Sequence, residues 1–500
     1  MVRSSSNTFH LIGIAGLSFL IVFLIRCLQL TFVAGKKIWL LFTDPLASIP
    51  GPWHAKFTGV VLKTHTLMGR RCFYIHDMHQ RYGAVVLIAP GEVDISDLEG
   101  FRDIHRIASG FQKTDWYTKF TPGMESNVFA MVDLQEHAAR RKVLARGFSN
   151  SSLQANFQHV VKDRAKLAVE RIKSEVARGD CDILKWWTLM ALDVTAQVAF
   201  GKRSTMLESG KKTEYTENVS LMVEATGIRA EGQFFYSLVR LFAPSTYVKY
   251  EASLKNVPLY GLRAARETLS TKLETFNLIS GMVKESTAED SKISEFGLAS
   301  QATAIIIAGS DTTATTLTYA VWAVLSRPEV RRKLVKEISK LPEDYSQTDL
   351  EGLSYLNAVL TETLRLYGAG PGSLPRVHRS KELVVGQYVI PPGVTLTTQA
   401  WTIHRDPEIF PEPDKFEPDR FVRGGLQGQQ KLAFHPFGAG TRICLGLHLA
   451  YMELRYGLAE FFRQCPEIEL SSKTTPESMR MVNYFLVAPK SKQCIVTSSR

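Results

Sequence analysis

The sequence predicts a mainly α protein with small β-sheets, preceded by one N-terminal transmembrane helix. Apolar residues recur at helical spacing through most of the chain, and the runs rich in β-branched residues are short and bounded by turns. A long apolar run near the N-terminus indicates the membrane segment. With 500 residues, 45% of them hydrophobic, the chain can build a large core and is unlike disordered proteins.

The N-terminal apolar run, residues 9–34, is predicted to be a membrane anchor. It reaches the about 20 apolar residues that span a bilayer if Arg26 extends its side chain to the interface. A cleavable signal peptide is the alternative, but no small-x-small cleavage site precedes Lys36, and the second half of the run over-extends such a peptide. Lys and Arg are more frequent after the span than before it, which predicts that the main domain faces the cytosol.

Residues 35–52 are predicted to form a stiff hinge after the anchor. Pro45 and the sequence Ile49-Pro50-Gly51-Pro52 restrict the backbone to extended conformations, which would hold a globular body at a set angle to the bilayer. An ordinary loop with prolines explains this stretch equally well. Residues 53–500 contain no Gly/Ser linker, like-charge block or internal repeat that would divide them, so we expect them to form a single large domain.

The remaining elements are assigned from periodicity and turn residues. In chain order they are a short strand pair within 82–98, helices over most of 136–200 and 213–284, a long helix over 295–325 ended by Pro328, a helix over 350–366 with a capping box at Thr348 and Glu351, strands and turns over 381–398, a helix over 445–462, and a strand pair near 481–496.

Charge and cysteine content exclude several classes of protein. The net charge is +11, but Lys and Arg are scattered and often lie beside Asp or Glu, so a solvated basic surface explains them better than a nucleic-acid site, and no nucleic acid partner is expected. The six cysteines form no CxxC pair, which excludes a dense disulfide scaffold and disfavours a structural zinc site. A reduced, cytosol-facing domain is the simpler account.

Residues 437–446, FGAGTRICLG, hold the cysteine best placed for chemistry. A helix is predicted directly after Cys444, and its N-terminus would favour thiolate over thiol by lowering a pKa that starts near about 8.5. Gly440 and Gly446 would let a flat macrocycle approach the backbone, and Arg442 could reach a carboxylate on it. A buried structural cysteine is the commoner case, but Phe, Gly, Arg, Cys and Gly in this order make chance a poor explanation.

This segment resembles the haem-binding signature of the cytochrome P450 family, in which the cysteine is the proximal iron ligand. The resemblance implies haem b as the cofactor, with its iron bound by the thiolate of Cys444, a ligand that favours O–O cleavage. It also implies the cytochrome P450 fold: mainly α, with a long central helix across the haem and a small β region. The resemblance extends over nearly the whole chain.

Two further segments match the family in the same order. Glu362-Thr363-Leu364-Arg365 places an acid and a base on one helix face, which alone would suggest a solvated surface pair. With the later segment FEPDRF, it resembles the family's buried Glu–Arg–Arg cluster. The resemblance therefore assigns Glu362, Arg365 and Arg420 to folding and haem retention.

Residues 308–313, AGSDTT, interrupt the long apolar helix with a glycine, an acid and hydroxyls. Without the Cys444 loop, a core helix whose hydroxyls bond back to carbonyls one turn earlier would be the better explanation. In the family this is where the helix opens over the distal haem face. The resemblance implies that Thr312, with Asp311, delivers protons to dioxygen.

Four basic residues are implied as partners of the haem carboxylates. His137 and Arg141 resemble the family's aromatic-xxx-Arg pair, although tryptophan is commonest where this chain has His137. Arg376 occupies a further propionate position, and Arg442 lies beside the cysteine. Each could instead be an ordinary surface residue, since an arginine fork alone does not identify a carboxylate site.

The resemblance implies a membrane-bound monooxygenase that uses dioxygen and electrons from an NADPH-dependent flavoprotein reductase, at the endoplasmic reticulum membrane. The Pro-rich hinge, His137 and the segment HRDPEIFPEPDKFEPDRF are most like fungal members of secondary metabolism. Segments expected to contact substrate are mostly apolar or small, which predicts a hydrophobic substrate such as a terpenoid or polyketide; they are 111–129, the middle helices, 301–308, 368–372 and 483–486.

Two other functions stay open at this point. A haem-thiolate isomerase or dehydratase would use neither dioxygen nor a reductase, but it would have no need of Asp311 and Thr312 for proton delivery. A non-enzymatic haem sensor would suit a blocked distal face, whereas the small residues of 301–308 suggest room for a substrate.

Overall fold

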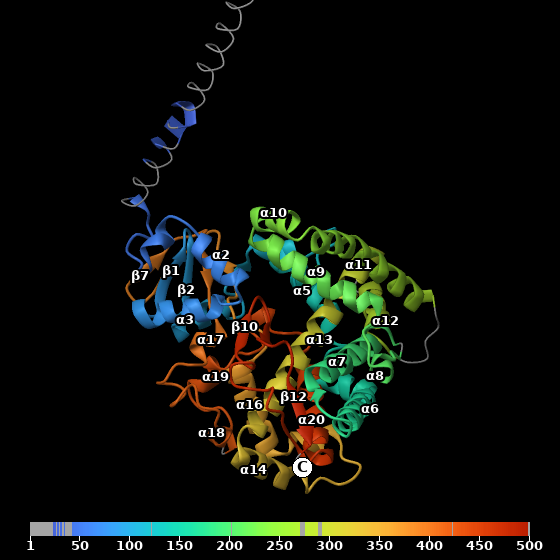
Figure 1. The fold of residues 1–500 in the computed structure, drawn as a ribbon. Helices are drawn as coiled ribbons and strands as arrows, with labels where there is room; N and C mark the ends of the chain where they lie inside the picture. The colour runs from blue at the N-terminus through green and yellow to red at the C-terminus, as the bar shows by residue number, and fades with distance from the viewer. Residues whose placement is uncertain are drawn as a thin grey trace, which may run out of the picture.

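The computed structural model describes residues 24–26, 28–29, 31–32, 35, 43–121, 123–201, 203–270, 276–288, 293–422 and 424–498. Helices make up most of this part of the chain; β1, β2 and β7 lie to one side of them, whereas β10 and β12 lie among them (Figure 1). Within the described residues the strands form one sheet of five strands and three smaller sheets. The predicted class, mainly α with small sheets, is confirmed.

Helix α13, Glu295–Leu325, runs through the helical body and organises its core. Its 31 residues give it a length of about 46 Å. Ser294 caps its N-terminus by accepting a hydrogen bond from the N–H of Gly297. The main hydrophobic core lies between this helix and its neighbours: α6 Asn150–Val176, α7 Ile183–Phe200, α16 Ser354–Tyr367 and α20 Leu447–Gln464.

The five-stranded sheet brings together segments that are distant in the sequence. Its strand order is β1 Val85–Ala89, β2 Glu92–Ile95, β8 Thr395–Thr397, β5 Arg376–Val377 and β3 Gln112–Lys113. β1 and β2 form the predicted antiparallel pair, with Val85 opposite Ile95. At the other edge, Lys113 on β3 is the direct partner of Arg376 on β5, so two cationic residues lie side by side.

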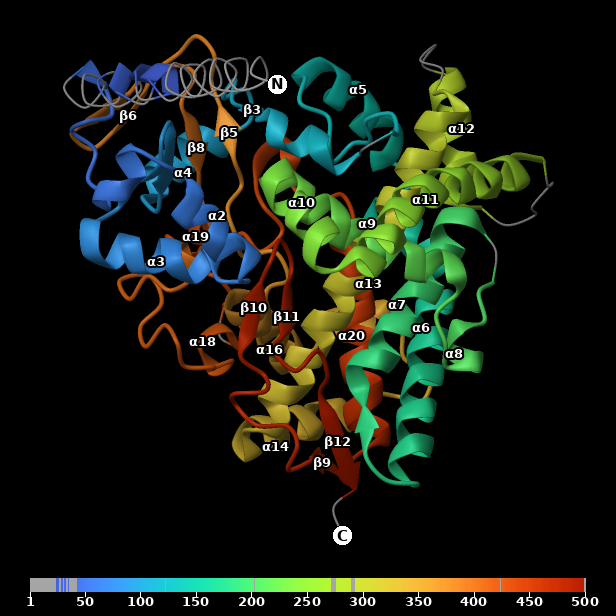
Figure 2. The same ribbon diagram turned by 45° about the horizontal axis from the view of Figure 1, so that its top comes forward.

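The other elements cover this framework (Figure 2). The helices are η1 Trp53–Lys56, α2 Val60–Leu67, α3 Arg71–Tyr82, α4 Leu98–His105, η2 Asp115–Phe120, α5 Leu134–Ala145, α8 Met206–Ser209, α9 Glu214–Glu231, α10 Gln233–Phe242, α11 Pro244–Ser270, α12 Leu278–Ala288, α14 Pro328–Ile338, α15 Gln347–Glu351, α17 Ala400–Ile403, α18 Asp419–Val422, α19 Gln430–Ala433 and η3 Gly440–Arg442. The strands are β4 Cys181–Asp182, β6 Leu383–Val385, β7 Tyr388–Ile390, β9 Ile468–Leu470, β10 Met481–Asn483, β11 Val487–Pro489 and β12 Ile495–Ser498.

The predicted helix over 350–366 is two helices, α15 and α16. The capping box begins two residues earlier than predicted, because the Ser346 hydroxyl accepts the N–H of Asp349 while the Asp349 carboxylate accepts the N–H of Ser346. α15 ends at Gly352, and α16 starts afresh at Ser354. The predicted terminal strand pair is also divided, since β10 pairs with β11 while β12 joins a separate sheet with β4 and β9.

The predicted anchor, residues 9–34, lies mostly outside the described residues, so it stays a prediction. Among the helices that the structure describes, none combines the length and the apolar character needed to cross a bilayer. In the predicted hinge, described from residue 43, Leu46 and Ile49 are buried and the carbonyl of Pro50 accepts the N–H of Leu87 at 2.8 Å. This segment is therefore packed against β1, and the proposed domain limits stay predictions.

Candidate haem-thiolate site

The loop before Cys444 is held in one shape by close backbone contacts. Gly438 and Gly440 have φ values of +72° and +63°, which favour glycine, and a Cβ on Gly440 would overlap the carbonyl oxygen of His105. The N–H of Cys444 donates to the carbonyl of Phe437 at 2.9 Å. The required glycines place the cysteine at a defined point between η3 and α20.

The Cys444 side chain is solvent-accessible although protein surrounds it closely. The surrounding protein removes enough water that burial raises the pKa of the thiol. The N–H of Gly446 and the charge of Arg141 act in the opposite direction, as the sequence suggested, but burial outweighs them. Burial therefore outweighs the lowering of this pKa that the local loop suggested, and coordination to a metal cation would favour the thiolate by displacing the proton.

Arg141, on α5, holds the cysteine loop by its backbone. Its Nη1 donates to the carbonyl oxygen of Ile443 at 2.7 Å, directly beside Cys444. The structure thus gives this arginine a contact with the ligand loop, where the resemblance implied a contact with a haem carboxylate. Its partner in the predicted pair, His137, lies one helical turn earlier and is buried.

Lys113 and Arg376 are buried cations on adjacent strands, with 6% and 4% of their surface exposed. Arg376 donates to the hydroxyl of Tyr117 at 3.2 Å. The Nζ of Lys113 lies 2.5 Å from the carbonyl oxygen of Phe129 and 4.1 Å from the centre of the Tyr117 ring. Burial, followed by the charges of Arg376 and Arg442, lowers the pKa of Lys113 well below its usual value.

Arg442 brings a further positive charge to the same place. Its Nη1 donates to the carbonyl of Met131 at 2.7 Å, while its buried Nε meets no acceptor among the residues described. Burial and then Arg376 lower the pKa of Arg442 to about 10. Burial and then Arg442 lower the pKa of His137 to about 3, so this imidazole is neutral. Asp133 is near, but its carboxylate accepts two N–H groups at the start of α5.

The arrangement fits a ligand that carries carboxylates. Buried like charges repel one another, and the donor left over on Arg442 lacks an acceptor, so an anionic group between them would relieve both costs. Haem b would supply its two propionates there and its iron to Cys444. Sequence analysis placed Arg442, Arg376 and His137 in this cluster but missed Lys113. The only sequence feature that could have indicated Lys113 is its position as a single cation among aromatic residues, in FQKTDWY at 111–117.

Helix α13 remains unbroken through residues 308–313. The expected opening of this helix is therefore wrong. The Thr312 hydroxyl donates to the carbonyl of Ala308 at 2.6 Å, the back-bonding that the sequence offered as an alternative. Ala308 is exposed even though α13 lies in the core, which places it on an internal surface. A Cβ on Gly309 would overlap the Thr195 side chain, so this glycine lets α7 pack closely.

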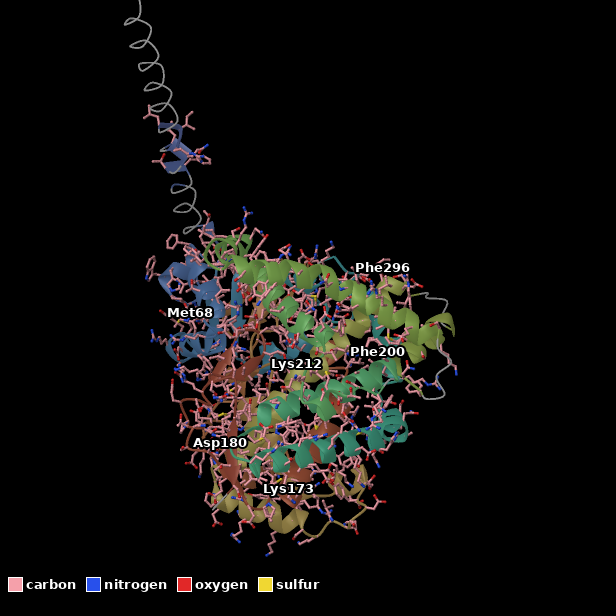
Figure 3. All side chains as sticks on the ribbon, turned by 45° about the vertical axis from the view of Figure 1, so that its right-hand side comes forward. Met68, Lys173, Asp180, Phe200, Lys212 and Phe296 are labelled. Atoms are coloured by element: carbon pink, nitrogen blue, oxygen red, sulfur yellow. The ribbon has the colours of Figure 1, made fainter. Side chains whose placement is uncertain are left out.

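Asp311 points to a small cavity between α13 and α9. The cavity holds about 20 Å³, room for one water molecule. Burial raises the pKa of Asp311, and the charge of Lys212, labelled in Figure 3, partly offsets this. Lys212 also lies 3.5 Å from the Ser220 hydroxyl. The cavity is lined by Leu192, Lys212, Thr216, Val219, Ser220, Val223, Ile307, Ser310 and Asp311.

The structure brings the predicted Glu–Arg–Arg cluster together. Glu362 and Arg365 are fully buried on α16 and form a two-point ion pair, with N–O distances of 2.6 and 2.8 Å. The Nε of Arg420 donates to the same carboxylate at 3.1 Å. Arg365 also donates to the carbonyls of His404 and Pro413 at 2.8 and 2.6 Å, which ties α16 to the segment that follows α17.

Comparison with known proteins agrees with this geometry. The family model described as "Cytochrome P450" matches residues 49–496. Cytochrome P450 monooxygenase stcB of Emericella nidulans is 37% identical over 481 residues, covering 93% of this chain and 90% of that protein. Cytochrome P450 monooxygenase tazI of Aspergillus terreus is 36% identical over 92% of this chain and 95% of its own length. Cytochrome P450 monooxygenase aflV of Aspergillus parasiticus is 34% identical over 93% of this chain and 94% of its own length. The chain belongs to the cytochrome P450 family of haem-thiolate monooxygenases, whose haem iron is bound by a cysteine thiolate.

Proposed function

We propose that this protein is a membrane-bound monooxygenase of fungal secondary metabolism that oxidises a hydrophobic small molecule, a terpenoid or polyketide. The observation that carries the proposal is the accessible Cys444 thiol in the loop that Arg141 holds, together with the neighbouring cations Lys113, Arg376 and Arg442. Relatives from several fungi carry the name monooxygenase. When bound, haem supplies the oxygen-activating chemistry, and the protein supplies orientation and proton control.

The residues of the candidate site have different proposed roles. Lys113, Arg376 and Arg442 would hold the haem carboxylates, and Arg141 holds the loop that presents the thiolate. Thr312 would be the hydroxyl on α13 that holds a proton and passes it on toward the oxygen-activating group. Asp311, which lines the cavity beside α9, would take up protons there, because burial raises the pKa of its carboxyl and so makes it easier to protonate.

The membrane anchor at 9–34 and the endoplasmic reticulum location belong to this proposal. Support comes from exposed apolar side chains at the end of α10, a helix at the upper edge of the ribbon in Figure 1. Leu241 and Phe242, at the end of α10, are 70% and 78% exposed. Exposed apolar groups of this size mark contact with lipid or protein.

Microsome experiments test the location of the full-length chain in a eukaryotic host. We expect the protein to stay with endoplasmic reticulum membranes after an alkaline carbonate wash. Protease added to intact microsomes should digest the catalytic domain, because that domain is proposed to face the cytosol. Release by the wash, or protection from the protease, would contradict the anchor or its orientation.

Electrons are proposed to come from an NADPH-dependent flavoprotein reductase. The net charge of +11 suits an acidic partner, and attraction between opposite surface charges is screened by salt. We therefore expect reductase-supported turnover to fall as ionic strength rises. Turnover indifferent to salt would count against a docking surface of this kind.

A reduced, CO-bound difference spectrum is the first test of the chemistry. The wild-type protein loaded with haem should show the thiolate band, and Cys444→Ser should lack it while still binding haem through the basic residues. Turnover under isotopically heavy dioxygen then separates the reaction classes, because a monooxygenase places labelled oxygen in its product. A haem-thiolate isomerase or dehydratase would turn over without label, and a haem sensor would not turn over.

A further inference from the structure

We infer that the substrate presents a planar aromatic ring system, received by an aromatic cluster made of Trp116, Phe120, Phe129 and Phe485. This inference rests on the proposed function and narrows its substrate class. The four side chains come from η2, from the loop before α5 and from the turn between β10 and β11.

The four rings meet one another mainly by their edges. Phe120 lies 4.7 Å from Trp116, 6.1 Å from Phe129 and 5.7 Å from Phe485, measured between ring centres. Phe485 lies 5.9 Å from both Trp116 and Phe129. None of these pairs is stacked face to face: three are edge-to-face and two are tilted, so no ring face is fully covered by another ring.

The cluster is not sealed in the core. Phe129 is 36% exposed and the other three rings are partly accessible, whereas the neighbouring Tyr117 ring is buried at 1%. Ala130, the residue after Phe129, is fully buried, so the backbone here is anchored while the ring remains uncovered. Partly accessible rings in a fixed frame can receive a flat guest with little reorganisation.

Two contacts place the cluster next to the haem-thiolate site. The Nζ of Lys113 lies 4.2 Å above the Phe129 ring, and this lysine belongs to the cation cluster with Arg376 and Arg442. The N–H of Val128 donates to the Gln301 side chain of α13 at 3.0 Å. Gln301 precedes Ala308 by about two helical turns, so the cluster lies beside the half of α13 that leads to Thr312.

The β10–β11 turn closes the other side of the cluster. The N–H of Val487 donates to the carbonyl of Ala369 at 2.9 Å, and β11 packs against α13. The turn at 368–372 leads directly into β5, which carries Arg376. Phe485 is therefore held between the distal helix and the strand that supports the cation cluster.

The chemistry of the rings favours one of the two proposed substrate classes. A saturated terpenoid would be stabilised beside an aromatic ring only by dispersion and by the exclusion of water. A leucine side chain would provide the same two contributions. A planar aromatic guest adds the attraction between ring edges and ring faces, worth roughly two- to tenfold in affinity for each pair. A frame of four edge-packed rings thus selects a flat aromatic skeleton, as in an aromatic polyketide.

A matched pair of probes tests the inference on the full-length, haem-loaded enzyme. 1-Naphthol and decahydro-1-naphthol share their carbon skeleton and hydroxyl group, but only the first is planar and aromatic. Equilibrium dialysis should show the wild-type enzyme binding 1-naphthol about tenfold more tightly, after correction for the difference in transfer from water to octanol. Equal corrected affinities would overturn the inference.

Conservative variants locate the preference. Phe120→Leu and Phe485→Leu keep an apolar side chain and should each reduce the ratio of affinities about threefold or more, whereas Phe485→Tyr should retain it. Phe73→Leu is the control, because Phe73 packs on Trp401 at 4.7 Å in an aromatic pair outside the cluster. A ratio that Phe73→Leu lowers as much as the cluster variants do would also overturn the inference.

The aromatic-substrate inference and the proposed function are tested by independent measurements. Dialysis measures ring preference without using the thiolate band, so an enzyme with that band and no ring preference contradicts only the aromatic substrate. A missing thiolate band contradicts the proposed function whatever the dialysis shows.

Discussion

The His404 imidazole accepts a hydrogen bond from the backbone N–H of His435, with an Nε2–N distance of 3.0 Å. Because Nε2 is the acceptor, Nδ1 carries the proton, and it lies 3.0 Å from the carbonyl oxygen of Arg365. Burial lowers the pKa of His404 well below its usual value, so the ring is neutral as this pairing requires. His404 therefore connects the buried Glu362–Arg365 pair to the segment that leads into the Cys444 loop.

Replacing His404 by phenylalanine should destabilise the protein and weaken its hold on haem. The change leaves a buried N–H and a buried carbonyl without partners, each at a cost of about 1–3 kcal/mol. The midpoint of thermal unfolding and the rate of haem transfer to an acceptor protein measure the two effects. His448→Phe, at an exposed position on α20, is the control, and a His404→Phe variant that matches it in both assays would contradict the connection.

Lys113→Met should have opposite effects with and without haem. The haem-free protein should become more stable, because a buried cation beside Arg376 and Arg442 is removed. Haem should dissociate roughly tenfold or more faster, since a charge-assisted contact is worth about 1.5–3 kcal/mol. Calorimetry of both forms and haem-transfer rates test this, with the exposed Lys431→Met as control. Slower haem loss, or a destabilised haem-free protein, would remove Lys113 from the carboxylate site.

Thr312→Ala should raise the amount of hydrogen peroxide released per NADPH consumed, at the expense of product. The hydroxyl that passes the proton is lost, while the helix keeps its backbone bonds. Thr316→Ala is a matched control, because its hydroxyl makes the same kind of bond, to the Thr312 carbonyl at 2.8 Å, but is buried one turn further on. Unchanged coupling in Thr312→Ala would exclude this hydroxyl from the proton route.

Lys212→Met should shift the pH dependence of coupling to higher pH. Burial raises the pKa of Asp311 and the Lys212 charge lowers it, so removing that charge raises the pKa further. At a given pH a smaller fraction of Asp311 is then ionised, and any limb of the profile that reports this carboxyl moves upward. Lys211→Met, which changes the exposed neighbour, should leave the profile in place. Superimposable profiles for wild type and Lys212→Met would show that Asp311 does not control proton supply.

Local patterns predicted the elements whose ends are set by their own residues. The predicted limits of α13 are confirmed: Pro328 follows its end, as the sequence indicated, and the structure shows that Ser294 caps its start. The break at Gly352 was missed, because an apolar pattern at helical spacing continues across it while the backbone turns to start α16. The predicted opening of α13 was also wrong, since close packing of Gly309 against α7 keeps the helix regular.

The sequence by itself determined the ligand loop and the pairing of Glu362 with Arg365 on one helix face, because each depends on side chains a few residues apart; the burial of that pair was decided by the fold. Only the tertiary structure placed Lys113 beside Arg376, and Lys212 across a cavity from Asp311. It also decided that burial raises the pKa of Cys444, where the local loop alone suggested a lowered one. Short-range geometry is encoded by neighbouring residues. Burial and the meeting of distant charges depend on how the whole chain packs.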